Sequence, residues 1–194
     1  MVRIGVIGTA GRKDDAPLMS KELYDDMYRI LLNYLAPWKD EDITLVSGGA
    51  AWADHLAVRA FLEQKCALEL HLPAPFQNSK FLVNASNFQV NLSPGSIANF
   101  YHHKMSSLLG HNTLFELQRA IDKKAHYQVY DGFYARNLKV GNVDMLIAFT
   151  FGTHDYNGPK VNATLAGLKD GGSAHTWNNS SAKYMIHINL NELL

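Results

Sequence analysis

The chain has 194 residues, of which 47% are hydrophobic and 19% are charged, a balance that is typical of one globular domain and excludes a disordered chain. Its 18 lysines and arginines equal its 18 aspartates and glutamates, so the formal net charge is zero. A protein that binds duplex DNA through many phosphates usually carries excess positive charge, so the composition argues against broad nucleic-acid binding.

Two further features bear on where the protein works. Cys66 is the single cysteine, so the chain cannot form an intramolecular disulfide. No apolar run reaches the roughly 18 residues that a membrane-spanning helix needs, and the apolar run at the start is too short for a signal peptide. We therefore expect a cytoplasmic protein with no membrane partner.

The first part of the chain alternates short apolar runs with helical periodicity. We expect strands at 3–7, 43–46 and 67–72 and helices at about 20–35 and 53–64. Ser20 can cap the first of these helices. Because the connections are short and the strands are continuous apolar runs, the pattern indicates a parallel sheet that is covered on both faces.

Residues 73–126 differ in composition, since they begin with two prolines and are rich in asparagine, serine, histidine and aromatic residues. We expect helices near 97–108 and 112–124. About 50 residues of this kind would make a poor independent core. The region is therefore predicted to be a mostly helical insertion in the middle of one domain that spans 1–194, packed over the sheet edge.

The alternation then resumes, with strands at 144–149 and 184–188, a polar loop at 150–172 and a helix near 173–182; residues 161–168 could form a further short helix. The predicted fold class is α/β, a Rossmann-like parallel sheet with helices on both faces. Its strands are expected side by side in one sheet, with their centres at Ile4, Leu45, Leu70, Leu146 and Ile186.

Three glycine-containing loops, each placed between a strand and a helix, carry the chemical signal. In a parallel sheet such loops share one edge, and ligands collect there. Glycine lets the backbone approach a ligand, and a helix N-terminus offers N–H groups to an anion, so the combination favours phosphate. One cleft is expected to bring together the glycines of these loops, which are Gly8, Gly48, Gly49, Gly171 and Gly172.

The first loop contributes five candidate ligand-binding residues, Gly8, Thr9, Ala10, Gly11 and Arg12. A hydroxyl and a guanidinium fork suit phosphate oxygens, although a plain turn is the alternative. The loop is not a G-x-G-x-x-G fingerprint, and no GK[ST] motif occurs in the chain. Neither standard dinucleotide binding nor nucleoside triphosphate hydrolysis therefore has motif support.

The second loop contributes the candidates Ser47, Gly48, Gly49, Ala50 and Asp54. Two glycines directly after a strand let the next helix begin close to the sheet. Asp54 could cap N–H groups of that helix, or it could hold a ribose or the neighbouring loop. The adjacent histidine points about 100° away on a helix and is not expected to pair with Asp54.

The third loop contributes Gly171, Gly172, Ser173 and Thr176, with Ser173 as an N-cap in the alternative reading. A further segment before the fourth strand adds Arg136 and Asn137, for which a surface position is the alternative. We hypothesise that phosphate affinity comes from the backbone of loops two and three together with one arginine, Arg12 or Arg136.

Other chemistries find less support in the sequence. The histidines show no H-x-x-x-H or H-E-x-x-H spacing and a single cysteine cannot build a zinc site, so no metal and no cofactor are expected. Ser47 lacks a G-x-S-x-G context, which argues against a hydrolase nucleophile.

The sequence LVSGGAAWADHLAV at 45–58 resembles the SGGA-x-G-AD-x-LA motif of the SLOG superfamily. This superfamily includes the YpsA-like proteins, the Rossmann domain of DNA-processing protein A and the lonely-guy phosphoribohydrolases. IGVIGTAGR at the start, ARN at 135–137, VDMLIAF at 143–149 and GGSAHTW at 171–177 follow in the order of the YpsA-like branch. The resemblance covers most of the chain and implies a Rossmann-like fold, a nucleotide-derived ligand and a possible homodimer. An apolar patch for the dimer could come from Phe81, Phe88, Phe100 and Tyr101.

The sequence departs from the superfamily pattern at two places. Lonely-guy enzymes carry P-G-G-x-G-T-x-x-E, whose glutamate supports cleavage of the N-glycosidic bond, whereas Thr176 or Asn178 stands at that position here. Trp52 stands where glycine is usual, which is expected to narrow or reshape the pocket.

Three functions remain in competition. The first is binding of a nucleotide or a nucleotide-derived phosphorylated ligand, as a sensor, carrier or nucleotide-processing protein. The second is an N-glycosidase acting on a nucleoside 5′-monophosphate, with Asp54 or Asp144 as the acid or stabilising carboxylate. The third is a single-stranded DNA binder like DNA-processing protein A, which zero net charge disfavours and a local basic groove would favour.

Overall fold

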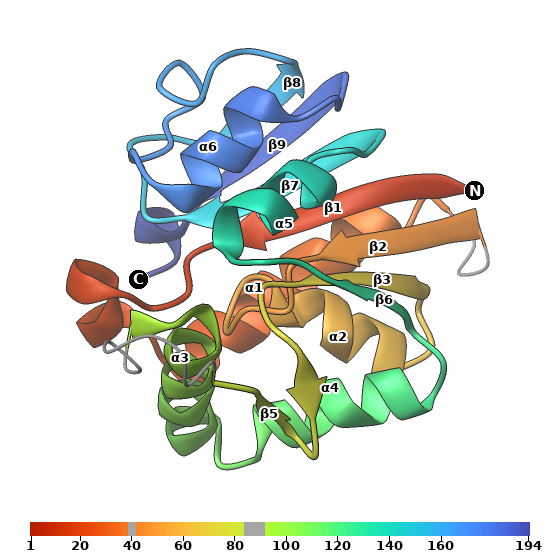
Figure 1. Cartoon of the computed structure of the whole chain (residues 1–194). Helices are drawn as coiled ribbons and strands as arrows, with labels where there is room; N and C mark the ends of the chain where they lie inside the picture. The colour runs from red at the N-terminus through yellow and green to blue at the C-terminus, as the bar shows by residue number, and fades with distance from the viewer. Residues whose placement is uncertain (39–41, 84–91) are drawn as a thin grey trace.

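The computed structural model describes residues 1–38, 42–83 and 92–194. Its main feature is a seven-stranded sheet with the strand order β6-β3-β2-β1-β7-β9-β8 (Figure 1). All neighbouring strands are parallel except β8 and β9, which are antiparallel. The strands are β1 (Val2–Gly8), β2 (Ile43–Ser47), β3 (Ala67–Leu72), β6 (His126–Val129), β7 (Met145–Thr150), β8 (Tyr156–Pro159) and β9 (Tyr184–Asn189). The five strands that the sequence predicts lie side by side and parallel, as β3-β2-β1-β7-β9.

Helices cover both faces of this sheet. The structure contains α1 (Lys21–Leu35), α2 (His55–Leu62), α3 (Pro94–Leu109), α4 (Thr113–Asp122), α5 (Phe133–Val140), α6 (Gly172–Asn179) and the short 3₁₀ helices η1 (Lys13–Leu18) and η4 (Leu190–Leu193). Side chains of α1, α2, α3 and α4 share one buried cluster with the sheet, and those of α5 and α6 share a second cluster on the other face. Figure 1 shows α5 and α6 in front of the sheet and α1 behind it. The predicted Rossmann-like α/β fold is thus confirmed.

The first helix shows how local sequence signals produce these elements. Ser20 accepts a hydrogen bond from the backbone N–H of Leu23, so it caps α1 as expected. Residues of α1 at three- and four-residue spacing are buried on one face, among them Leu23, Met27 and Leu31. The stripe packs on the same face of the sheet as Ile4 and Leu45.

Several elements were not predicted from the sequence, among them β6, β8 and α5. All four residues of β6 are exposed at the sheet edge, so the strand has no apolar run. β8 contains Gly158 and Pro159, which normally indicate a turn, and an edge strand tolerates them. α5 buries only Arg136 and Val140, too few for a helical stripe. Residues 161–168, which could have formed a helix, do not form one, and a turn spans 163–167.

Residues 73–126 connect β3 to the parallel neighbour β6. They contain a separate two-stranded hairpin of β4 (Phe76–Gln77) and β5 (Lys80–Phe81), followed by α3 and α4. Phe81 is 1% exposed and stacks edge-to-face on Phe76, so it cannot contribute to a surface patch. Phe100 is 51% exposed, and Phe88 lies outside the described residues. The aromatic dimer patch is therefore wrong in its placement of Phe81, and the dimer itself stays a prediction.

The topology defines where a ligand can bind. From β1 the chain adds β2, β3 and β6 on one side, and then β7 and β9 on the other. A crevice forms outside the carboxyl ends of the strands where the order reverses, here between β1 and β7. The strand ends at this edge include Gly8 of β1, Ser47 of β2 and Thr150 of β7. Over the described ranges, no helix has the length and apolar character needed to cross a membrane.

Candidate functional site

A cleft of about 400 Å³ lies at this carboxyl edge. Its walls come from the loop after β1, the loop after β2, α5, the end of β7 and the first turn of α6. It contains twelve of the predicted ligand-binding residues, which are Gly8, Thr9, Ala10, Arg12, Ala50, Asp54, Arg136, Asn137, Gly171, Gly172, Ser173 and Thr176. Four others, Gly11, Ser47, Gly48 and Gly49, lie outside its lining. The glycines of loops one and three thus meet at one cleft, whereas those of loop two do not face it.

Loop one contacts the cleft through its backbone and Arg12. A Cβ on Gly8 would lie 2.0 Å from the carbonyl oxygen of Phe149, so only glycine lets β1 and β7 come this close. The Thr9 hydroxyl donates to Asp15 at 2.6 Å and accepts from the N–H of Gly11, so it shapes the loop. The Arg12 guanidinium lies 5.0 Å from the ring centre of Tyr101 and 5.2 Å from that of Phe133, within cation–π range of both.

Loop two binds its own aspartate. Asp54 Oδ2 accepts from the N–H groups of Gly48 at 3.1 Å and Ala50 at 3.4 Å, and from Arg136 Nη1 at 2.8 Å. A Cβ on Gly48 would lie 1.1 Å from Arg136 Nη1, so the glycine makes room for the guanidinium. The hypothesis that the backbone of loop two holds phosphate is therefore wrong, because the Asp54 carboxylate already occupies these donors.

The Asp54–Arg136 ion pair is almost enclosed, with 7% and 10% of the two side chains exposed. Asp54 Oδ2 takes all three hydrogen bonds, and no described group bonds Oδ1. Asp54 lines the cleft, so this second oxygen is available to a ligand. Arg136 in turn has its Nε buried without a hydrogen-bond partner among the described residues. The pair joins loop two to α5 across the cleft.

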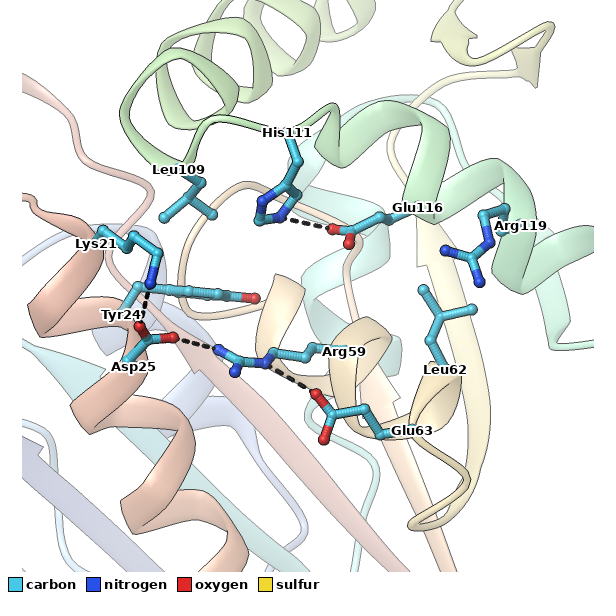
Figure 2. A pocket seen from close by; sticks show the side chains of 10 residues that line it. All are labelled: Lys21, Tyr24, Asp25, Arg59, Leu62, Glu63, Leu109, His111, Glu116 and Arg119. Carbon is cyan, nitrogen blue, oxygen red and sulfur yellow. Dashed lines mark hydrogen bonds and ion pairs between the residues drawn. The ribbon is translucent and has the colours of Figure 1, made fainter.

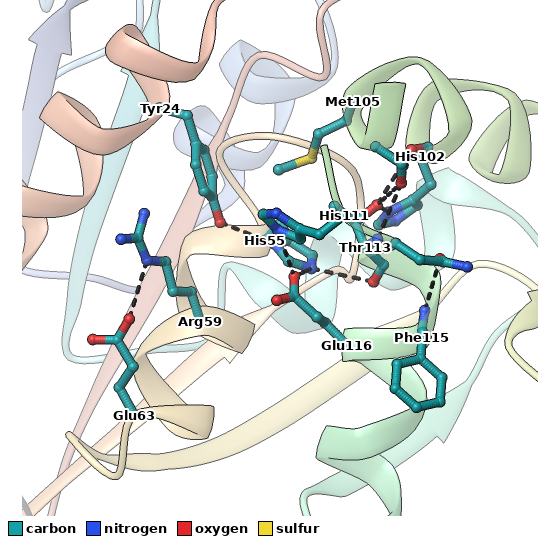
Figure 3. A network of polar contacts seen from close by, with 12 residues as sticks. Tyr24, His55, Arg59, Glu63, His102, Met105, His111, Thr113, Phe115 and Glu116 are labelled. Atoms are coloured by element: carbon teal, nitrogen blue, oxygen red, sulfur yellow. Dashed lines mark hydrogen bonds and ion pairs between the residues drawn. The ribbon is translucent and has the colours of Figure 1, made fainter. Parts of the chain in front are cut away.

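A buried polar network supports loop two from the core side (Figure 3). His102 Nε2 lies 3.0 Å from the carbonyl oxygen of Gly49, and its Nδ1 lies 3.0 Å from Thr113 Oγ1. His55 contacts the hydroxyl of Tyr24 at 2.9 Å and the carbonyl oxygen of Thr113 at 3.3 Å, and as expected it does not pair with Asp54. Burial lowers the pKa of His55 to about 3 and that of His102 to about 4, so both are neutral near pH 7.

Trp52 does not narrow the cleft as expected. Its side chain is buried in the core and packs edge-to-face on Tyr24, with its indole nitrogen beside Gly11. The backbone of Trp52 has φ 64°, a left-handed conformation that glycine adopts most readily. The tryptophan thus keeps a glycine-like backbone and directs its ring away from the ligand cleft.

Loop three places a helix N-terminus at the cleft. Gly171 is the N-cap of α6 and supplies no side-chain cap. Within the described part of the chain, no acceptor bonds the N–H groups of Gly172, Ser173 and Ala174. The Ser173 hydroxyl donates to the carbonyl oxygen of Gly8 at 3.0 Å, so it joins α6 to β1 and is not an N-cap. The arrangement leaves three N–H donors and a positive dipole end open to an anion.

Asp144, the other candidate catalytic carboxylate, lies at the wrong end of the sheet. It precedes β7 and accepts a hydrogen bond from the backbone N–H of Arg3, near the amino end of β1. The cleft lies at the opposite, carboxyl edge, so Asp144 cannot act there. The prediction of Asp144 as a catalytic residue was wrong because Asp144 stands before β7. Residues before and after a parallel strand lie at opposite edges of the sheet.

The sequence reading missed several cleft residues. Lys169 pairs with Asp15 at 2.9 Å, and both line the cleft. Phe133 lies between Arg12 and Arg136, 5.2 and 5.6 Å from their guanidinium carbons. Thr150 also lines the cleft. A usable signal existed for Thr150, because it directly follows the predicted strand at 144–149 and therefore had to lie at the ligand edge.

A second cavity of about 320 Å³ lies between α1, α2 and the start of α4 (Figure 2). Apart from Arg119, for which no ion pair occurs among the described residues, its charged groups pair with one another. Asp25 binds Lys21 at 2.8 Å and Arg59 at 2.7 Å, and Arg59 also binds Glu63 at 3.2 Å. A ligand would have to break these pairs, so the cleft at the sheet edge is the better candidate site. Among the residues that the structure describes, no group of three or more histidine, cysteine, aspartate or glutamate side chains could hold a metal ion.

Comparisons with known proteins give one relative. No family model matches the chain, and no solved structure matches it. The chain is 37% identical over 196 residues to the protein described as "Uncharacterized protein R261" from Acanthamoeba polyphaga mimivirus. The alignment covers 97% of this chain and 96% of the viral protein. The chain therefore belongs to the same protein family as this mimivirus protein.

Proposed function

We propose that the cleft binds the phosphate of a nucleotide or nucleotide-derived ligand, and that the protein serves as a sensor, carrier or processing protein for it. One observation carries the proposal. The uncapped first turn of α6 opens on the same cleft as Arg12 through Gly172 and Ser173, and the N–H groups of these two residues and of Ala174 have no acceptor among the described residues. Helix N–H groups and a guanidinium together form the preferred surroundings of a phosphate.

The charges of the cleft identify the arginine that takes part. Arg136 is neutralised by Asp54, and Lys169 by Asp15. Arg12 has no ion-pair partner in the part of the chain that the structure describes, and it is held by two aromatic rings instead. We therefore assign Arg12, rather than Arg136, to the phosphate. Arg136 holds Asp54 in place.

Membership of the SLOG superfamily is part of the same proposal. Three features support it, namely the ligand cleft at the carboxyl edge, the motif aspartate Asp54 bound within its own loop, and the positive φ of Trp52 where the motif has glycine. A homodimer belongs to the proposal as well. So does a cytoplasmic location, which fits a chain with one cysteine and thus no intramolecular disulfide.

Isothermal titration tests the proposal. The protein is titrated with nucleoside mono- and diphosphates, and with the unphosphorylated nucleosides as controls. We expect at least one phosphorylated compound to bind about tenfold or more tightly than its nucleoside, because charge-assisted hydrogen bonds contribute roughly 1.5–3 kcal/mol. Equal affinity for a nucleoside and its phosphate would contradict phosphate binding.

The geometry of Asp54 favours a hydrolytic version of this function. Arg136 and two N–H groups fix one carboxylate oxygen, and the other is left to a ligand. A fixed carboxylate in a cleft can stabilise the positive charge that develops on a sugar as its bond to a base breaks. Release of free base from nucleoside 5′-monophosphates, followed by chromatography, tests this. Asp54→Asn should abolish the release, and no release by the wild-type protein would leave binding alone.

A further inference from the structure

Thr150 lines the cleft, and its hydroxyl group contacts a buried histidine. It is the last residue of β7, lines the cleft and is 8% exposed. Its Oγ1 lies 2.7 Å from Nε2 of His187 on the neighbouring strand β9. The register pairs Ala148 with His187 and Thr150 with Asn189, so the two side chains lie on the same face of the sheet, one step apart.

The proton between these two groups can be assigned from the other side of the imidazole. His187 Nδ1 lies 2.8 Å from the carbonyl oxygen of Ala166, and a carbonyl can only accept. Nδ1 therefore carries a hydrogen. Burial lowers the pKa of His187, so the ring is neutral near pH 7 and Nε2 carries no hydrogen. The Thr150 hydroxyl must then donate its proton to Nε2, which leaves its lone pairs for the cleft.

Two other hydroxyl groups of the cleft also donate their hydrogen to a group of the protein. Ser173 donates to the carbonyl oxygen of Gly8, and Thr176 donates to that of Gly172, both at 3.0 Å. Each of these hydroxyls, like that of Thr150, therefore presents an acceptor to a ligand. A phosphate is an acceptor too, so it gains nothing from these hydroxyls, whereas the free N–H groups at the start of α6 can donate to it. Thr150, which lies on β7 and not on α6, instead suits a ligand group that donates hydrogen bonds.

We propose that Thr150 accepts a hydrogen bond from a sugar hydroxyl of the ligand, and that His187 is the positioning residue that holds the threonine proton away from the cleft. The inference rests on the proposed function, since it takes the phosphate to lie at α6. Thr150 at the end of β7 and Gly172 and Ser173 in the first turn of α6 line the same cleft. The group nearest the phosphate in a nucleotide is its sugar, so the ligand class is a hydroxyl-bearing sugar phosphate.

The test uses the four common ribonucleoside 5′-monophosphates and their 2′,3′-dideoxy counterparts, with affinities measured by calorimetry. The wild-type protein should prefer a ribonucleotide over its dideoxy form by about tenfold, as expected for a lost hydrogen bond that leaves a buried acceptor unpaired. Thr150→Val has nearly the same shape and should bring this ratio close to one. Thr150→Ser keeps the hydroxyl group and should keep the wild-type ratio of ribonucleotide to dideoxynucleotide affinity.

A ratio that survives in Thr150→Val, or a wild-type protein without the preference, overturns the inference. A preference for phosphates over nucleosides with no discrimination between the two sugars would refute the sugar contact and leave phosphate binding intact. Failure of all monophosphates to bind would refute both.

The proton assignment has a test that needs no ligand and no variant. Nitrogen NMR of the imidazole should show His187 with its hydrogen on Nδ1 between pH 7 and 8. A hydrogen on Nε2 would overturn the inference directly.

Discussion

Arg12 and Arg136 both line the cleft, yet their surroundings give them different tasks. Arg136 is almost enclosed and pairs with Asp54 at 2.8 Å. Arg12 is exposed and lies between the rings of Tyr101 and Phe133. A guanidinium on aromatic rings keeps its N–H groups free in its own plane, so it can still bind a phosphate.

Arg12→Ala should therefore weaken the binding of a nucleoside monophosphate by about ten- to a hundredfold, because one charge-assisted contact is lost. Calorimetry measures the effect, and Arg29→Ala on the exposed surface of α1 is the matched control. An Arg12→Ala variant that binds as tightly as the Arg29→Ala control would remove Arg12 from the site.

A substitution at Gly48 should lower the stability of the protein. A methyl group there would collide with Arg136 Nη1, so Gly48→Ala should separate Arg136 from Asp54. Breaking a buried ion pair costs about 3 kcal/mol, which should appear as a loss of unfolding free energy in urea. Gly172→Ala is the control, since its Cβ would come no closer than 3.9 Å to Asn137. Equal stability of the two variants would show that the pair contributes little.

Among the elements, α6 carries the largest share of the proposed chemistry. It has no N-cap side chain, although Asp170 accepts from the N–H of Gly171 just before it. A capped helix would be more stable, and the open first turn is therefore consistent with a binding role.

Gly172→Asp should separate stability from binding. A carboxylate in the first turn favours the helix dipole by about 0.3–1 kcal/mol, so the melting temperature should stay equal or rise. The same charge should repel a phosphate and weaken its binding by about tenfold or more. Gly172→Asn has nearly the same shape without the charge and serves as the control. Equal phosphate affinity of the two variants would place the anion elsewhere.

Some of the helices and strands could be predicted from the sequence and others could not. The central strands and α1 could be predicted, because continuous apolar runs and a capped apolar stripe are local signals. The edge strand β6 and helix α5 could not, because neither buries enough apolar surface to leave a periodic pattern. The cleft residues followed from strand ends, whereas the capture of loop two by Asp54 and the pairing of Thr150 with His187 depend on tertiary contacts.

At the scale of the whole molecule, the two faces of the sheet have different roles. The face with α1, α2 and α4 carries the larger core and encloses the neutral histidines His55 and His102. The face with α5 and α6 carries a smaller core and provides two walls of the cleft. Changes at His55 and His102 should therefore act mainly on stability.

The buried histidines predict how stability depends on pH. Their folded pKa values, about 3 and about 4, lie below the ordinary value of 6.5, so the unfolded chain binds protons that the folded protein does not. With respect to these two histidines, the free energy of unfolding is highest above pH 6.5. It falls as the pH decreases below 6.5, by about 1.4 kcal/mol per pH unit for each histidine. His102→Gln should flatten the profile between pH 6 and 4.5, whereas the exposed His103→Gln should not. Parallel profiles for the two variants would contradict neutral burial of His102.

Amide NMR on the ¹⁵N-labelled protein can show whether a phosphate binds at the start of α6, because it locates the phosphate without any substitution. The tightest-binding nucleoside monophosphate from calorimetry is added stepwise, and its nucleoside is added to a second sample. If the phosphate binds at the start of α6, the amides of Gly172, Ser173 and Ala174 should shift with the monophosphate and shift little with the nucleoside. Shifts that instead centre on the second cavity, at Lys21, Arg59 and His111, or that are the same for both compounds, would contradict it.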